Sequence, residues 1–122
     1  MSRAWVLASR AAFVGCLTVI AWASLLPPEQ IPEGAEVSDK VAHALGYALL
    51  GALAVASGLR WLPAVALATG IGLVLEVAQL MTGYRRFEWT DLAADAAGAA
   101  LGATLMSLVA RWPTGRGLSR SS

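Results

Sequence analysis

The sequence predicts an all-α integral membrane protein, a bundle of about four transmembrane helices with both termini cytoplasmic. Of its 122 residues, 57% are hydrophobic and only 14% are charged, which leaves too few polar side chains to cover a water-soluble surface. Four apolar stretches each approach or reach the roughly 20 residues that cross a bilayer as a helix. These stretches are residues 11–26, 41–58, 61–82 and 92–110.

The first stretch allows two readings. Two arginines precede it, and Ala21-Trp22-Ala23 is similar to the cleavage site of a secretory signal. However, the stretch is long for the core of a signal, and Trp22 suits the membrane interface, so an uncleaved helix is favoured. Cleavage would leave three helices.

Proline and polar residues separate the first two stretches. Residues 27–38 contain three prolines and three glutamates and are expected to form a loop. Ser38 is a suitable N-cap for the second helix, and Asp39 in the first turn would suit the positive end of the helix dipole. This helix is expected to end at Ser57-Gly58, followed by a very short turn into the third.

The third stretch is expected to end near Thr82-Gly83, before a charged and aromatic connection. Thr90 would cap the fourth helix. One transmembrane domain, residues 1–113, accounts for all of these elements. Residues 114–122 are rich in Gly, Ser and Arg, and they predict a disordered cytoplasmic tail.

Basic residues in the connections predict the orientation, since positively charged flanks are retained in the cytoplasm. Six lie on the side of the N-terminus and three on the opposite side, which places both termini inside. The expected inner residues are Arg3, Arg10, Arg60, Arg111, Arg116 and Arg120, and the expected outer ones are Lys40, Arg85 and Arg86.

Composition also limits the partners. The net charge of +1 provides no basic surface for nucleic acid, so the lipid bilayer is the expected environment and nucleic acid is not an expected partner. Cys16 is the only cysteine and cannot form an internal disulfide. No phosphate loop or dinucleotide fingerprint is present, and no cofactor is expected.

Polar residues of three predicted helices fall at one depth near the outer end. An ionisable group inside an apolar stretch, such as Glu76 or Asp95, is expected to face the bundle interior. Helical spacing places the others on matching stripes. The set is Asp39, His43 and Tyr47 on the second helix, Glu76 and Gln79 on the third, and Asp91 and Asp95 on the fourth. Either these residues form a functional site, or they simply tie the helices together.

If there is chemistry, His43 is the natural acid or base because imidazole titrates near neutral pH. The candidate catalytic residues are His43, Glu76, Asp91 and Asp95; the candidate substrate-binding residues are Asp39, Lys40, Tyr47, Gln79, Arg85 and Arg86. A metal site is disfavoured because no histidine pair or cysteine cluster has ligand spacing. Arg85 and Arg86 would hold an anionic group or serve as ordinary interfacial anchors.

Small residues predict where two helices approach closely. Gly98 and Gly102 have the small-xxx-small spacing of packed membrane helices, and they continue the stripe of Asp91 and Asp95. The polar end is therefore expected to open above a tightly packed inner half.

These residues together resemble the VanZ-like family. Asp39-Lys40-Val41-Ala42-His43 with Tyr47 is similar to its "DKxxHxxxY" opening, and Glu76 to Gln79 is similar to its "ExxQ" segment. Arg85 or Arg86, then Asp91-Leu92 and Gly98 to Gly102, is similar to its closing block, and Ser24 to Pro27 to its entry into the first loop. Asp95 departs from the pattern, which commonly has asparagine there.

The resemblance implies a multi-pass protein of the bacterial plasma membrane, in a family named for a member linked to teicoplanin resistance. It implies no particular reaction. Three functions remain open. The first is an enzyme or binding site for an amphipathic envelope molecule, such as a lipid-linked saccharide precursor, approached from the outer leaflet. The second is a noncatalytic accessory subunit of an envelope-synthesis or export complex. Ion transport is less favoured because no polar file crosses the inner half.

Overall fold

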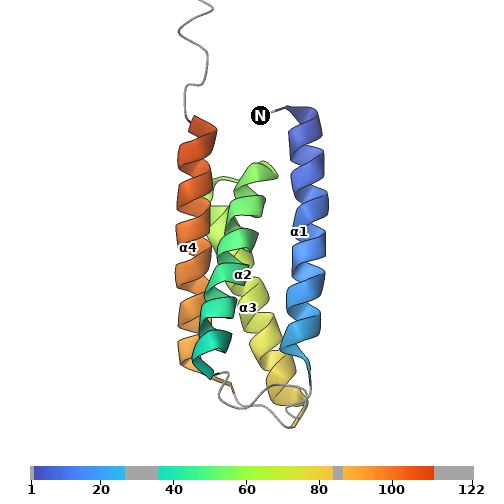
Figure 1. Ribbon diagram of the computed structural model, residues 1–122, viewed down its shortest axis with the longest axis vertical. Coiled ribbons are helices and arrows are strands. Elements are labelled where there is room, and N and C mark those ends of the chain that lie inside the picture. The colour runs from blue at the N-terminus through green and yellow to red at the C-terminus, as the bar shows by residue number, and fades with distance from the viewer. Residues whose placement is uncertain (1, 27–35, 84–86, 112–122) are drawn as a thin grey trace, which may run out of the picture.

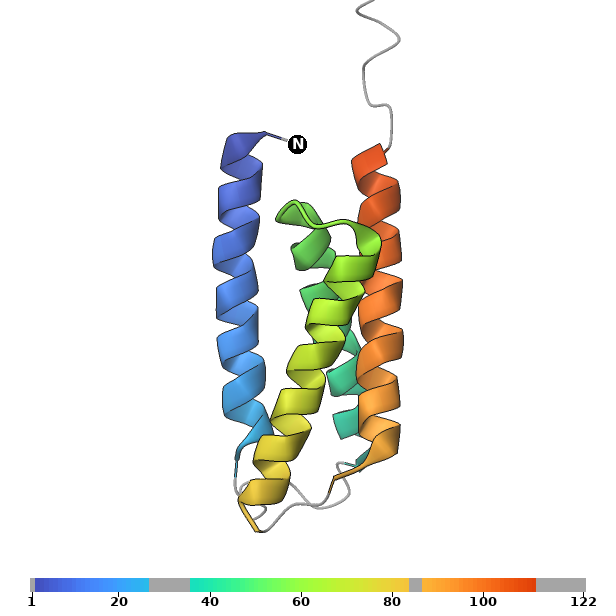
Figure 2. The ribbon, with the colours of Figure 1, turned by 180° about the vertical axis from the view of Figure 1, so that it is seen from behind.

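The computed structural model describes residues 2–26, 36–83 and 87–111, with the backbone alone at 36–39. These residues form α1 (Arg3–Ser24), α2 (Glu36–Ala56), α3 (Trp61–Met81) and α4 (Trp89–Arg111). The helices lie side by side, and consecutive helices run in opposite directions (Figure 1, and from behind in Figure 2). The predicted all-α bundle is confirmed.

The helices have the length and surface of membrane spans. α1, α3 and α4 are each long and apolar enough to cross a bilayer, and the apolar part of α2, Lys40–Ala56, is shorter. Large apolar side chains remain exposed on the outside of the bundle, including Leu45 (66%), Val74 (67%) and Met81 (80%). Such a surface is stable in lipid and would be costly in water. The chain is therefore a membrane protein.

Local capping explains where α1 begins and where α2 turns into α3. The hydroxyl of Ser2 accepts a hydrogen bond from the backbone N–H of Trp5, so α1 starts eight residues before its apolar stretch. After α2, Gly58 adopts a positive φ of 110°, and the Leu59 N–H donates to the carbonyl of Ala54. The predicted short turn between antiparallel neighbours is confirmed.

Two predicted caps are wrong. α2 begins at Glu36, so Ser38 lies inside the first turn rather than before it. α4 begins at Trp89, which puts Thr90 in its first turn. The Thr90 hydroxyl lies 3.4 Å from Nζ of Lys40, from which it accepts a hydrogen bond. The Thr90 hydroxyl thus has a long-range partner on α2.

α2 and α4 form the most extensive helix pair, because glycines let their backbones meet. A Cβ at Gly98 would overlap the backbone carbonyl of Ala44, and one at Gly102 would overlap that of Ala48. From the other side, a Cβ at Gly51 would overlap the carbonyl of Ala99. The predicted close approach at Gly98 and Gly102 is confirmed.

Small side chains fill the core along this seam. Buried Ala54, Ala64 and Ala103 pack beneath a cluster centred on Tyr47 and Leu50. α1 lies against this core through partly buried side chains, which are Phe13, Cys16, Leu17 and Ile20. The start of α1 and the end of α4 lie at one end of the bundle, and the ends of α1 and α3 lie at the other (Figure 1).

Candidate functional site

The predicted polar layer lies at the end of the bundle where α1 and α3 finish and α2 and α4 begin (Figure 1). Three of its members are almost fully buried, with 1% of Tyr47, 2% of Glu76 and 1% of Asp95 exposed. Ionisable side chains within membrane helices are expected to face the interior, and Glu76 and Asp95 do so. The site is therefore built around two buried carboxyl groups.

His43 of α2 and Asp95 of α4 form its central contact. Nδ1 of His43 lies 3.1 Å from Oδ1 of Asp95, and 13% of the histidine side chain is exposed. A carboxylate beside Nδ1 favours the tautomer with its proton on that nitrogen, which then donates to the carboxylate. Nε2 is then the nitrogen that accepts or returns a proton. The pair has the arrangement of an oriented acid or base.

Asp95 also packs against α3 at a residue without a side chain. A Cβ added at Gly72 would lie 2.7 Å from Oδ2 of Asp95, so any larger residue there would displace the carboxyl group. The position of the carboxylate is thus set jointly by α2, α3 and α4.

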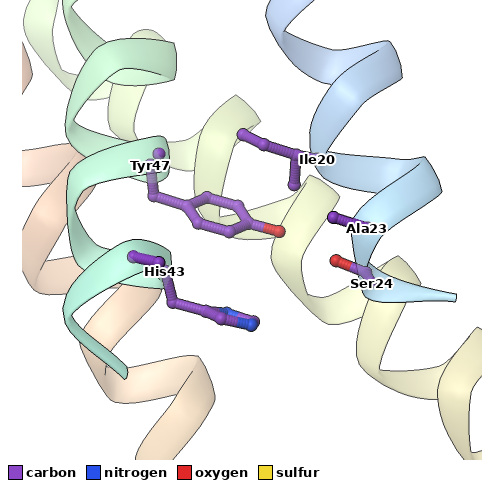
Figure 3. A pocket seen from close by; sticks show the side chains of 7 residues that line it. Ile20, Ala23, Ser24, His43 and Tyr47 are labelled. Carbon is purple, nitrogen blue, oxygen red and sulfur yellow. The ribbon is translucent and has the colours of Figure 1, made fainter. Parts of the chain in front are cut away.

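A pocket of about 110 Å³ lies between α1 and α2 beside His43. Figure 3 shows the side chains of His43 and Tyr47 extending from α2 toward α1, with the Tyr47 hydroxyl directed at Ala23 and Ser24. The two rings are stacked, with centroids 6.2 Å apart and planes 22° apart. Ile20 provides an apolar wall from α1. The pocket therefore combines an apolar wall with polar groups from two aromatic rings.

Glu76 and Gln79 connect α3 to its neighbours. Oε2 of Glu76 accepts a hydrogen bond from the backbone N–H of Glu88 at 3.2 Å, just before α4 begins. Nε2 of Gln79 donates to the backbone carbonyl of Ser24 at 2.7 Å, where α1 ends. The contact of Gln79 joins segments 55 residues apart in sequence. Gln79 thereby positions one wall of the pocket, because Ser24 lines it.

Lys40 joins α2 to the start of α4 at the rim. Its Nζ lies 2.9 Å from Oδ1 of Asp91 and 3.3 Å from Oε2 of Glu88. The side chains of Lys40 and Glu88 are about half exposed, whereas only 15% of Asp91 is exposed. Asp91, predicted beside Asp95 as a catalytic group, is thus paired with Lys40, while Asp95 contacts the histidine.

Some predicted residues lie outside this description. The side chain of Asp39, all of Arg85 and Arg86, and the predicted tail 114–122 are not among the described residues. Among those that are, no three His, Cys, Asp or Glu side chains group as metal ligands.

Sequence reasoning missed Ser24, Gly72 and Glu88. Ser24 acts through its backbone carbonyl, and Gly72 leaves room for the Asp95 carboxyl group because it has no side chain. Neither residue type therefore points to the site. Glu88 was visible as an acidic residue before α4, but its pairing with Lys40 across 48 residues has no local pattern. These contributions depend on tertiary packing.

A family model described as VanZ/LLP1 matches residues 7–110, which is nearly the whole chain. The matched region includes all four helices apart from the first residues of α1 and the last residue of α4. Comparison with curated proteins found no match, and comparison with solved structures found none either. With its helical membrane bundle and its polar layer of His43, Glu76, Gln79 and Asp95, the chain belongs to the VanZ/LLP1 family.

Proposed function

We propose that this protein, a VanZ-like protein of the bacterial cell envelope, binds or modifies an amphipathic envelope molecule at an outward-facing site around His43, and thereby affects susceptibility to teicoplanin-type glycopeptides. A lipid-linked saccharide precursor has the required chemistry, with a polar head and an apolar tail. The observation that carries the proposal is the His43–Asp95 contact beside the pocket between α1 and α2.

The lining of the pocket supports an amphipathic ligand. Ala23 and Ala42 line the pocket and are exposed, so we take the pocket to open between α1 and α2 toward the surrounding membrane. Ile20 offers apolar contact, while His43 and Tyr47 offer polar contact. Ligand sites commonly combine a mostly apolar wall with a few convergent polar groups. A tail lying in the membrane would place its head beside the histidine.

His43 has the central role in this function. With its Nδ1 beside Asp95, the imidazole would exchange a proton with the bound head group through Nε2, or hydrogen-bond to it there. In this proposal Asp95 orients the ring, and Tyr47 provides a stacked surface and a hydroxyl. Glu76, Gln79 and Lys40 have a supporting role, because their described contacts connect helices.

The test is complementation in a bacterium that lacks its own copy, with teicoplanin susceptibility as the readout. His43→Ala should abolish the effect while membrane abundance stays normal. Ala23→Phe should do the same by filling the pocket from α1 while both members of the His43–Asp95 pair are kept. Ala11→Phe is the matched control, because Ala11 is exposed on α1 and does not line the pocket. Full activity of both His43→Ala and Ala23→Phe would refute a working site here.

A noncatalytic accessory subunit is the alternative, and the many contacts that join helices in the polar layer favour it. In that case His43→Ala would be active, and the chain would copurify with one stoichiometric partner from an envelope-synthesis or export complex. The same pair of experiments therefore distinguishes the two functions.

A further inference from the structure

A second pocket lies at the end of the bundle opposite His43. It is an open groove lined by the end of α2, the turn into α3, the first residues of α3 and the C-terminal end of α4. Its volume is about 520 Å³, which falls in the range of roughly 300 to 1,000 Å³ typical of small-molecule sites. Nothing in the proposed function uses this pocket.

Two arginines line it without a described acidic partner. Arg60 comes from the turn before α3, and Arg111 comes from the end of α4. Both side chains are exposed, and neither guanidinium makes a hydrogen bond or ion pair within residues 2–26, 36–83 and 87–111. The acidic side chains described are Glu76, Glu88, Asp91 and Asp95, and all lie at the far end of the bundle. Among the described residues, the charged side chains that line the pocket are thus both basic.

The remaining walls suit a lipid at the membrane interface. Leu59 and Leu62 provide apolar surface, and Ser107 provides a hydroxyl. Trp61 is fixed in place because its indole Nε1 donates to the hydroxyl of Thr104 on α4 at 2.9 Å. Tryptophan and arginine are typical of the headgroup region, where a ring meets the apolar chain and a guanidinium meets the phosphate.

We propose that this pocket binds a phosphate group through Arg60 and Arg111. The phosphate is carried by the headgroup of an anionic phospholipid, or it is free phosphate, and the two sources are separated by experiment. Guanidinium groups suit phosphate because their planar donors form paired, charge-assisted hydrogen bonds. The site is independent of His43, so the two proposals can fail separately.

The experiment uses the full chain purified in detergent and stripped of lipid. Binding of phosphatidylglycerol, of phosphatidylcholine and of inorganic phosphate is measured for the wild type and for variants, by native mass spectrometry for the lipids and by thermal shift for phosphate. Arg60→Gln and Arg111→Gln should each weaken binding of the phosphate-bearing ligand at least about tenfold, since the loss of even one charge-assisted hydrogen bond has about that effect. Arg60→Lys, which keeps the charge, should weaken it less.

Arg3→Gln is the matched control, because it removes one positive charge at the same end without lining the pocket. The affinity of this variant for the phosphate-bearing ligand should equal that of the wild type. A preference for phosphatidylglycerol that depends on Arg60 and Arg111 assigns the site to a lipid headgroup. Binding of inorganic phosphate alone, with the same dependence, assigns it to free phosphate. Equal binding by the wild type and both glutamine variants, or an equal loss in Arg3→Gln, overturns the proposal.

Discussion

Gln79 shows how one side chain supports the candidate site from outside it. Its amide donates at 2.7 Å to the buried carbonyl of Ser24, and so holds the end of α1 against α3. Gln79→Leu should leave that carbonyl without its partner and lower the free energy of unfolding by about 1 kcal/mol, a common value for hydrogen bonds between membrane helices. Unfolding in mixed micelles with a denaturing detergent measures the change.

The control is Thr18→Val, which removes a hydroxyl that donates to the carbonyl of Val14 within exposed α1. Its stability should remain near that of the wild type, because this bond joins no two helices. If Gln79→Leu is as stable as Thr18→Val, the contact with Ser24 contributes nothing to the bundle.

Residue types and helical spacing were sufficient to predict most of the polar layer. His43, Tyr47, Glu76, Gln79 and Asp95 come together because a period of 3.6 residues places each on an inward face. Which of them pair could not be predicted, since pairing depends on how the helices rotate and slide against each other. Asp91 and Asp95 share a stripe, yet one contacts Lys40 and the other His43.

Among the elements, α2 and α4 pack closely only because glycines stand where their backbones meet. Gly98→Ala would introduce a Cβ into the space of the Ala44 carbonyl, so the helices must separate. Overpacking of this kind costs about 1 to 3 kcal/mol, and we expect the free energy of unfolding to fall by that amount. Detergent unfolding measures this change too, and binding at the His43 site should weaken because His43 and Asp95 lie on the two separated helices.

Gly70→Ala is the matched change, because a Cβ at Gly70 meets nothing within 4 Å. Alanine there should keep or raise the stability, since glycine in the middle of a helix costs roughly 0.5 to 1 kcal/mol. Equal stability of Gly98→Ala and Gly70→Ala would contradict the close packing of α2 on α4.

Helix number and order could be predicted from apolar length, while the exact ends could not. The end of α2 just before Gly58 followed from glycine chemistry, because a positive φ suits that residue. The starts of α2 and α4 were misplaced because a Ser or Thr before an apolar stretch was taken as the cap. Thr90 instead lies in the first turn of α4, where its hydroxyl accepts a hydrogen bond from Lys40 that no local pattern indicates.

At the scale of the whole molecule, the two ends of the bundle differ in the sign of their described charged side chains. The described acidic side chains lie at the end of the bundle that holds the His43 pocket, while the described charged side chains at the end with Arg60 and Arg111 are all basic. Because basic flanks are retained in the cytoplasm, the His43 end should face outward and both termini should lie inside. This orientation decides whether an envelope molecule in the outer leaflet can reach the pocket.

Cysteine labelling in intact cells tests the orientation. In a Cys16→Ser background, a membrane-impermeant maleimide should label Glu88→Cys directly, and it should label Ser2→Cys and Leu59→Cys only after the membrane is permeabilised. Glu88 is about half exposed at the His43 end, whereas Ser2 and Leu59 are exposed at the opposite end. The reverse pattern would turn the pocket toward the cytoplasm, and the ligand would then have to come from the inner leaflet. Labelling of Ser2→Cys and Leu59→Cys from different sides would contradict the bundle itself, because α1 and α2 must both cross the membrane between them.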